Sequence, residues 1–101
     1  MTAGPHPDTH KALHRALAHH QRGEFDQARA LYEQILAARP DDPDALHMLG
    51  VLSNQLGEQQ RAVDLIGRSL EIVPDNTIAY FNRGVAYQAL GEHAKAIECY
   101  T

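Results

Sequence analysis

The chain has 101 residues, of which 44% are hydrophobic and 22% charged, and this composition predicts one soluble globular domain. Its formal net charge is −4 and its basic residues are scattered, which argues against a nucleic-acid partner. No apolar run approaches the roughly 18 residues that span a membrane, and the N-terminal residues lack a secretory core, so we expect a cytoplasmic protein.

In chain order, the first predicted helix covers residues 12–21, and the sequence RGEF after it predicts a turn. A second helix presents apolar residues from Ala28 to Leu36 at spacings of three and four, and Pro40 ends it. Asp42 is a capping residue followed by a first-turn proline, and it begins a third helix that ends at Gly57.

A fourth helix follows, with one apolar face from Ala62 to Val73. We expect Pro74 to end it and Asp75 to cap the next helix. A third pair of helices then continues to the C-terminus, with Gly91 between the two. No segment alternates between apolar and polar residues as a strand does, so the predicted fold class is all-α.

Columns of like residues recur every 34 positions. They hold a turn glycine, a helix-ending proline, an alanine, a small residue in the first helix of each pair and a large residue in the second. The columns are Gly23, Gly57 and Gly91; Pro40 and Pro74; Ala28, Ala62 and Ala96; Ala16, Gly50 and Gly84; and Tyr32, Ile66 and Tyr100. The chain is therefore predicted to contain three copies of one helix pair.

Glycines inside the predicted helices need an explanation, because glycine there costs about 1 kcal/mol relative to alanine. We expect Gly50 and Gly84 to permit a close approach of the paired helix, with Ala62 and Ala96 on the other side of the contact. Gly67 also lies inside a helix, but the pattern assigns it no role.

The repeated unit resembles the tetratricopeptide repeat, a 34-residue pair of helices. The matching residues are Leu46, Leu49, Gly50, Gly57, Ala62, Ile66 and Pro74 in the second copy, Tyr80, Gly84, Tyr87, Gly91, Ala96 and Tyr100 in the third, and Gly23, Ala28, Tyr32 and Pro40 in the first. The resemblance implies a right-handed α-solenoid of antiparallel helix hairpins. It implies an N-terminal tail at residues 1–8 and repeat units at 9–42, 43–76 and 77–101, the last incomplete.

The resemblance also implies a concave groove lined by the first helix of each pair. The candidate groove residues are His14, Leu17 and Gln21; His47, Met48, Val51, Asn54 and Gln55; and Phe81, Asn82, Val85 and Gln88. Amide side chains both donate and accept hydrogen bonds, which suits the main chain of an extended peptide. The carboxylate clamp of some repeats needs Lys and Asn where this chain has His10, Leu13 and Leu17, so that activity is not expected.

The function implied by the resemblance is a non-catalytic scaffold that binds a protein or an extended peptide. The alternative, also from resemblance, is a segment that recruits substrate for a larger transferase, similar to units in bacterial O-linked N-acetylglucosamine transferase-like proteins. The sequence shows no serine–base pair, phosphate-binding glycine loop or paired carboxylates. We therefore expect no catalytic residue and no cofactor within these residues.

Seven histidines are unusual for this length, and His6, His10 and His14 are spaced by four. Pro7 is expected to keep His6 outside the helix and no carboxylate is placed as a further ligand, so no metal site is predicted. Protonation near neutrality is expected to change the charge of the groove. The single Cys99 excludes an internal disulfide and is expected to be a small helix residue.

The third unit reaches Thr101 before the proline that ends each earlier unit, and without a polar capping helix. We therefore expect the chain to be the N-terminal part of a longer array or protein. Ile97 and Tyr100 would then lack neighbours, and the last helix is expected to fray or to associate with another copy of the chain.

Overall fold

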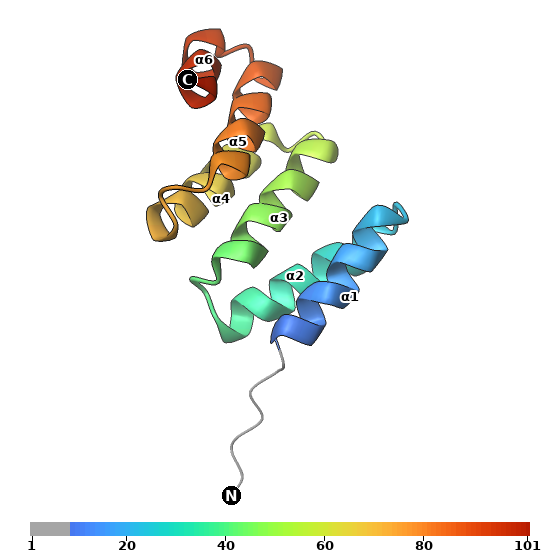
Figure 1. The fold of residues 1–101 in the computed structure, drawn as a ribbon. Helices are drawn as coiled ribbons and strands as arrows, with labels where there is room; N and C mark the ends of the chain where they lie inside the picture. Colours follow the sequence, from blue (N-terminus) through green and yellow to red (C-terminus); the bar gives the residue numbers. More distant parts are fainter. Residues whose placement is uncertain (1–8) are drawn as a thin grey trace, which may run out of the picture.

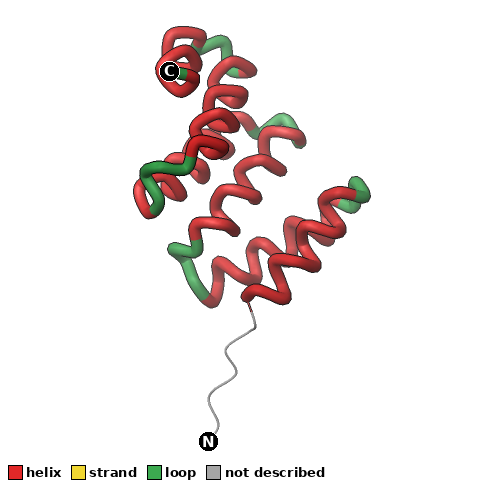
Figure 2. Tube along the Cα trace, in the orientation of Figure 1, coloured by secondary structure: helices red, strands yellow, loops and turns green. Residues whose placement is uncertain are grey.

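The computed structural model describes residues 9–101, and the predicted tail at 1–8 lies outside the described residues. Short turns join its successive helices (Figure 1). The helices are α1 (Thr9–Gln21), α2 (Phe25–Ala38), α3 (Pro43–Gln55), α4 (Gln59–Ile72), α5 (Thr77–Ala89) and α6 (His93–Tyr100). No strand occurs in the part of the chain described (Figure 2), so the all-α prediction is confirmed.

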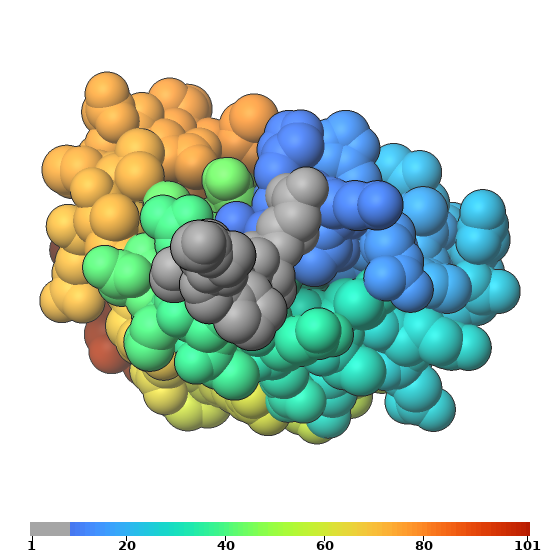
Figure 3. Space-filling model, turned by 90° about the horizontal axis from the view of Figure 1, so that it is seen from below, coloured from blue at the N-terminus to red at the C-terminus, as the bar shows by residue number. Residues whose placement is uncertain are grey.

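The helices form three antiparallel hairpins that stack in sequence order. Helix α1 pairs with α2, α3 with α4 and α5 with α6, and successive hairpins meet through α2 with α3 and α4 with α5. Figure 3 shows that the start of α1 and the turns at 39–42 and 73–76 lie at one edge of this stack. The predicted α-solenoid of helix hairpins is therefore confirmed.

The first helices of the hairpins touch one another, whereas the second helices stand apart. Helix α3 contacts both α1 and α5, but the backbones of α2 and α4 do not meet, nor do those of α4 and α6. Two ion pairs bridge α2 and the start of α4: Arg61 pairs with Glu33 at 3.6 Å, and Arg29 with Glu58 at 2.9 Å. A stack curves toward the side on which its helices are closer, so α1, α3 and α5 form the inner face.

Each hairpin turn is built on one glycine with a positive φ. Gly23, Gly57 and Gly91 have φ of 77°, 83° and 79°, a region that side chains with a Cβ avoid. In the middle hairpin the Gly57 amide donates to the Asn54 carbonyl and the next amide donates to Ser53, at 3.1 and 2.8 Å. This pair of bonds satisfies the last carbonyls of α3 and reverses the chain, as predicted for the glycine column.

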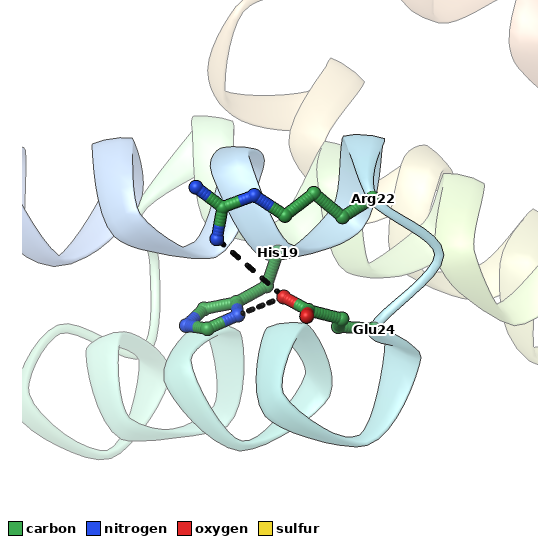
Figure 4. Close-up of polar contacts among 3 residues, drawn as sticks. All are labelled: His19, Arg22 and Glu24. Atoms are coloured by element: carbon green, nitrogen blue, oxygen red, sulfur yellow. Dashed lines mark hydrogen bonds and ion pairs between the residues drawn. The ribbon is translucent and has the colours of Figure 1, made fainter.

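The residue after each turn glycine is a glutamate, a column that the sequence interpretation missed. In the first turn, Nδ1 of His19 donates to Glu24 at 2.7 Å and Arg22 lies 3.6 Å from the same carboxylate (Figure 4). The hydrogen bond from His19 lowers the pKa of Glu24. In the middle hairpin the equivalent Glu58 pairs with Arg29 instead. The signal was visible, because these glutamates obey the period of 34.

Helices α3 and α5 begin with side-chain caps. The carboxylate of Asp42 accepts a hydrogen bond from the Ala45 amide at 3.0 Å, and Pro43 occupies the first turn, as predicted. The cap of α5 is Asn76, which accepts from the Ala79 amide at 3.1 Å. The assignment of this cap to Asp75 was therefore wrong by one residue.

The small residues inside α3 and α5 lie opposite a large residue of the paired helix. A Cβ added to Gly50 would lie 2.5 Å from Cγ1 of Ile66 and 3.2 Å from the backbone oxygen of Ala62. A Cβ added to Gly84 would lie 2.5 Å from the ring of Tyr100. The glycines permit close packing as expected, but their nearest partners are the large residues of the column, with alanine contributing only its backbone in α4.

Candidate binding face

The twelve predicted groove residues lie on α1, α3 and α5, the helices of the inner face. The structure buries His47, half-buries Leu17, Met48, Val51, Asn54, Asn82 and Val85, and exposes His14, Gln21, Gln55, Phe81 and Gln88. Met48 packs against the main core cluster of the first two hairpins, so part of its side chain serves the fold. The remaining residues offer a face of mixed apolar and amide character.

Two consecutive side-chain hydrogen bonds connect the first hairpin to the second. The hydroxyl of Tyr32 donates to Nδ1 of His20 at 2.9 Å, and Nε2 of His20 donates to Oε1 of Gln55 at 2.5 Å. Burial raises the pKa of Tyr32 to about 12, so its hydroxyl keeps the proton that it donates. The predicted groove residue Gln55 is thus engaged within the protein, and it joins α3 to α1.

A second histidine–amide bond joins the second hairpin to the third. The Nδ2 group of Asn82 donates to Nε2 of His47 at 2.9 Å, which places the proton of the neutral ring on Nδ1. His47 is 8% exposed, and burial lowers its pKa while the charge of Asp44 opposes that shift. Two predicted groove residues therefore bind each other, and Asn82 keeps one N–H and its oxygen for another partner.

Asn54, between these two bonds along α3, has an amide oxygen that is shielded from solvent. This oxygen accepts no hydrogen bond from residues 9–101. A buried acceptor without a donor is unfavourable, because its lost hydration is not replaced. The χ2 angle of asparagine is broad, so a rotation of the amide can offer the oxygen to an incoming N–H group.

The third hairpin exposes residues whose equivalents in the second hairpin are buried. Phe81, Ile97 and Tyr100 are 57%, 61% and 43% exposed, whereas the equivalent residues His47, Val63 and Ile66 are 8%, 6% and 0% exposed. The difference arises because α5 covers the second hairpin. A hollow of about 330 Å³ between α5 and α6 is lined by Thr77, Phe81, Cys99 and Tyr100.

Two histidines lie close together near the start of α1. The rings of His10 and His14 lie 4.6 Å apart, one turn along α1, while His6 lies outside the described residues. No group of three or more His, Cys, Asp or Glu side chains that could hold a metal ion occurs within residues 9–101. Among the same residues, no helix is long and apolar enough to cross a bilayer.

Comparisons with known proteins place this geometry in a family. Two family models described as tetratricopeptide repeat match residues 13–77 and 77–101. No curated protein sequence matches the chain significantly.

Three solved structures illustrate the similarity of fold. The Sgt2 TPR domain from Aspergillus fumigatus is 24% identical over 96% of this chain and 64% of its own, with a TM-score of 0.87. The second TPR of Spaghetti (RPAP3), bound to HSP90 peptide SRMEEVD, is 15% identical over 91% of this chain and 85% of its own, with a TM-score of 0.86. MamA is 22% identical over 91% of this chain, with a TM-score of 0.84, and the chain spans only 50% of it. At these identities the likeness concerns the fold.

Proposed function

Because the chain belongs to the tetratricopeptide repeat family, we propose that it is a non-catalytic interaction module that binds an extended protein segment on the face of α1, α3 and α5. The observation that carries the proposal is the arrangement of this face. Half-buried Val51 and Val85 lie one helical turn from Asn54 and Asn82, whose amide groups have unused hydrogen-bonding capacity, and half-buried Leu17 lies on the first helix of the same face. Apolar contact and amide bonding to a main chain suit a peptide.

The chemistry of the face favours a partner that is not strongly acidic. The Spaghetti domain binds a peptide with three acidic side chains, SRMEEVD. The twelve candidate residues include neither Lys nor Arg, so acidic side chains there would lose hydration without gaining a cationic partner. We therefore propose a segment of apolar and uncharged residues as the ligand of this chain.

The test is a selection of random peptides on the 101-residue chain, followed by titration of a selected peptide with a fluorescent label. We expect Phe81→Ala with Asn82→Ala to weaken binding about tenfold or more, which corresponds to about 1.4 kcal/mol. Asn54→Ala should also weaken it. Gln34→Ala, on the exposed surface of α2, is the control and should bind as the wild type does. If all four proteins bind the peptide with equal affinity and have unchanged helicity, the inner face is not the binding site.

The exposed surface of the third hairpin favours a second interaction, self-association through α6. Phe81, Ile97 and Tyr100 form an apolar surface next to a hollow, and the equivalent surface of the second hairpin is covered by a helix. The substrate-recruiting role in a transferase, the boundaries of the three units and the cytoplasmic location stay predictions from the sequence, because no described contact bears on them.

A further inference from the structure

A glycine and an arginine face each other between α4 and α5. Gly67 lies inside α4, where a glycine disfavours the helix. A Cβ added there would meet only Nη1 of Arg83, at the ordinary contact distance of 3.8 Å. Packing within the described chain therefore does not require this glycine, in contrast to Gly50 and Gly84. The glycine instead opens space in front of the Arg83 guanidinium.

Arg83 stands where the preceding hairpin interface has an apolar core residue. Its counterpart 34 positions earlier is Leu49, which is 1% exposed in the main core cluster. Tyr80 and Tyr87, on either side of Arg83 along α5, both pack on apolar clusters that include residues of α4. The guanidinium carbon lies 5.4 and 5.9 Å from their ring centroids. The two rings therefore hold the guanidinium at the α4–α5 interface.

The guanidinium of Arg83 has no hydrogen-bond acceptor among residues 9–101. Its Nε is buried without a partner, and the side chain makes neither a hydrogen bond nor an ion pair to residues 9–101. It borders a hollow of about 430 Å³ that Asp64 and Glu71 also line, and Asp64 accepts from Gln60 at 3.1 Å instead. A guanidinium carries five N–H donors in a fixed fork, so this hollow offers a planar set of unused donors.

We propose that the hollow between α4 and α5 is a binding site for a carboxylate group, held by Arg83 and given room by Gly67. The two oxygens of a carboxylate match the spacing of two guanidinium N–H groups. Arg68 lines the same hollow and donates to the Pro40 carbonyl at 3.2 Å, so two arginines face two carboxylates there. The Arg83 fork matches the shape of a planar carboxylate, and Asp64 and Glu71 repel a doubly charged ligand more strongly than a singly charged one, so a phosphate dianion is disfavoured.

The site is tested by titrating the isotope-labelled chain with sodium acetate and following backbone amide shifts by NMR, with chloride keeping the ionic strength constant. We expect saturable shifts at Gly67, Arg83 and Tyr87, with a Kd on the order of 10 mM for so small a ligand. Arg83→Leu, which restores the residue type of Leu49, should abolish them. Arg15→Leu is the matched control, since Arg15 occupies the same column but lies on α1, away from the α4–α5 hollow, and it should leave them unchanged.

Arg83→Lys keeps the positive charge but lacks the planar fork of donors, so it should weaken acetate binding several-fold. This variant provides the test if Arg83→Leu does not fold. A pentapeptide with a central glutamate and blocked ends distinguishes the source of the group: tighter binding than acetate identifies a protein side chain, and weaker binding a free small carboxylate. The proposal is overturned if acetate gives no saturable shift, if the shifts persist in Arg83→Leu, or if inorganic phosphate moves the same amides as strongly.

Discussion

Three glycines inside helices face different surroundings, and the same substitution by alanine should therefore change stability in three different ways. In each case alanine improves the intrinsic helix propensity by about 1 kcal/mol. What differs is the space for the added methyl group. Gly67 offers free space, Gly84 faces the ring of Tyr100, and Gly50 faces Ile66 and the backbone of Ala62.

The space at each site sets the magnitude. For Gly67→Ala we expect the free energy of unfolding to rise by about 1 kcal/mol, because the nearest atom lies 3.8 Å away. Gly50→Ala must displace a fully buried Ile66 and an α4 carbonyl, and overpacking of this kind costs about 1–3 kcal/mol. The net effect there is a loss of up to about 2 kcal/mol after the propensity gain.

Gly84→Ala should fall between these two. The clashing ring belongs to Tyr100, which is 43% exposed and can turn toward solvent. Its hydrogen bond from the hydroxyl to Gln88, at 3.1 Å, would be lost in that movement. An exposed bond of this kind contributes about 1 kcal/mol or less, so the propensity gain and the loss nearly cancel.

The assay is urea denaturation followed by circular dichroism at equal protein concentration for the wild type and the three variants. We expect Gly67→Ala to be the most stable protein and Gly50→Ala the least stable. The wild type and Gly84→Ala should lie between them, close together. A domain of this size shifts its Tm by about 4–8 °C per kcal/mol, so thermal melts resolve the series. Stabilisation by Gly50→Ala equal to that by Gly67→Ala would refute the packing argument for the repeated small residue.

Further predictions concern a cap, a buried histidine and the exposed end. Asp42→Ala should lower the free energy of unfolding by about 1 kcal/mol through loss of the α3 cap, and Asp41→Ala, in urea melts run alongside, should change it little. Burial lowers the pKa of His47 below its usual 6.5 in the folded state, so its contribution to stability is complete above about pH 6.5 and is lost as the pH falls. His47→Asn should flatten the dependence of stability on pH between 7 and 5, whereas the exposed His93→Asn should not. Sedimentation should show that Ile97→Glu lowers any self-association of the chain, and a wild type that stays monomeric at high concentration would contradict docking through α6.

The helices were predictable because local chemistry sets their ends. Gly57 needs a positive φ and Asp42 supplies a cap, and both effects operate within a few residues of the chain. The period of 34 then fixed which helices pair. The cap at Asn76 was missed because Asp75 beside it is an equally good capping residue by type, and only the backbone path decides between them.

The contacts between hairpins were not predictable in the same way. The bonds from His20 to Gln55 and from His47 to Asn82 both span 35 positions, a step that becomes meaningful only after the stacking is known. The space in front of Gly67 has the same origin, since it depends on an arginine of the following hairpin. Side chains far apart in sequence meet through the geometry of the stack, and the period alone does not encode that geometry.

The two sides of the stack are tied together by different chemistry, and this has a mechanical consequence. Histidine–amide hydrogen bonds join the hairpins along α1, α3 and α5, whereas ion pairs such as Arg29 with Glu58 join them on the outer side. Salt weakens the solvent-accessible ion pairs, while acid removes the lone pair that His47 offers to Asn82. Ionic strength should therefore change the spacing of the hairpins on the outer side and pH their spacing on the inner side, so each condition alters the pitch of the superhelix independently.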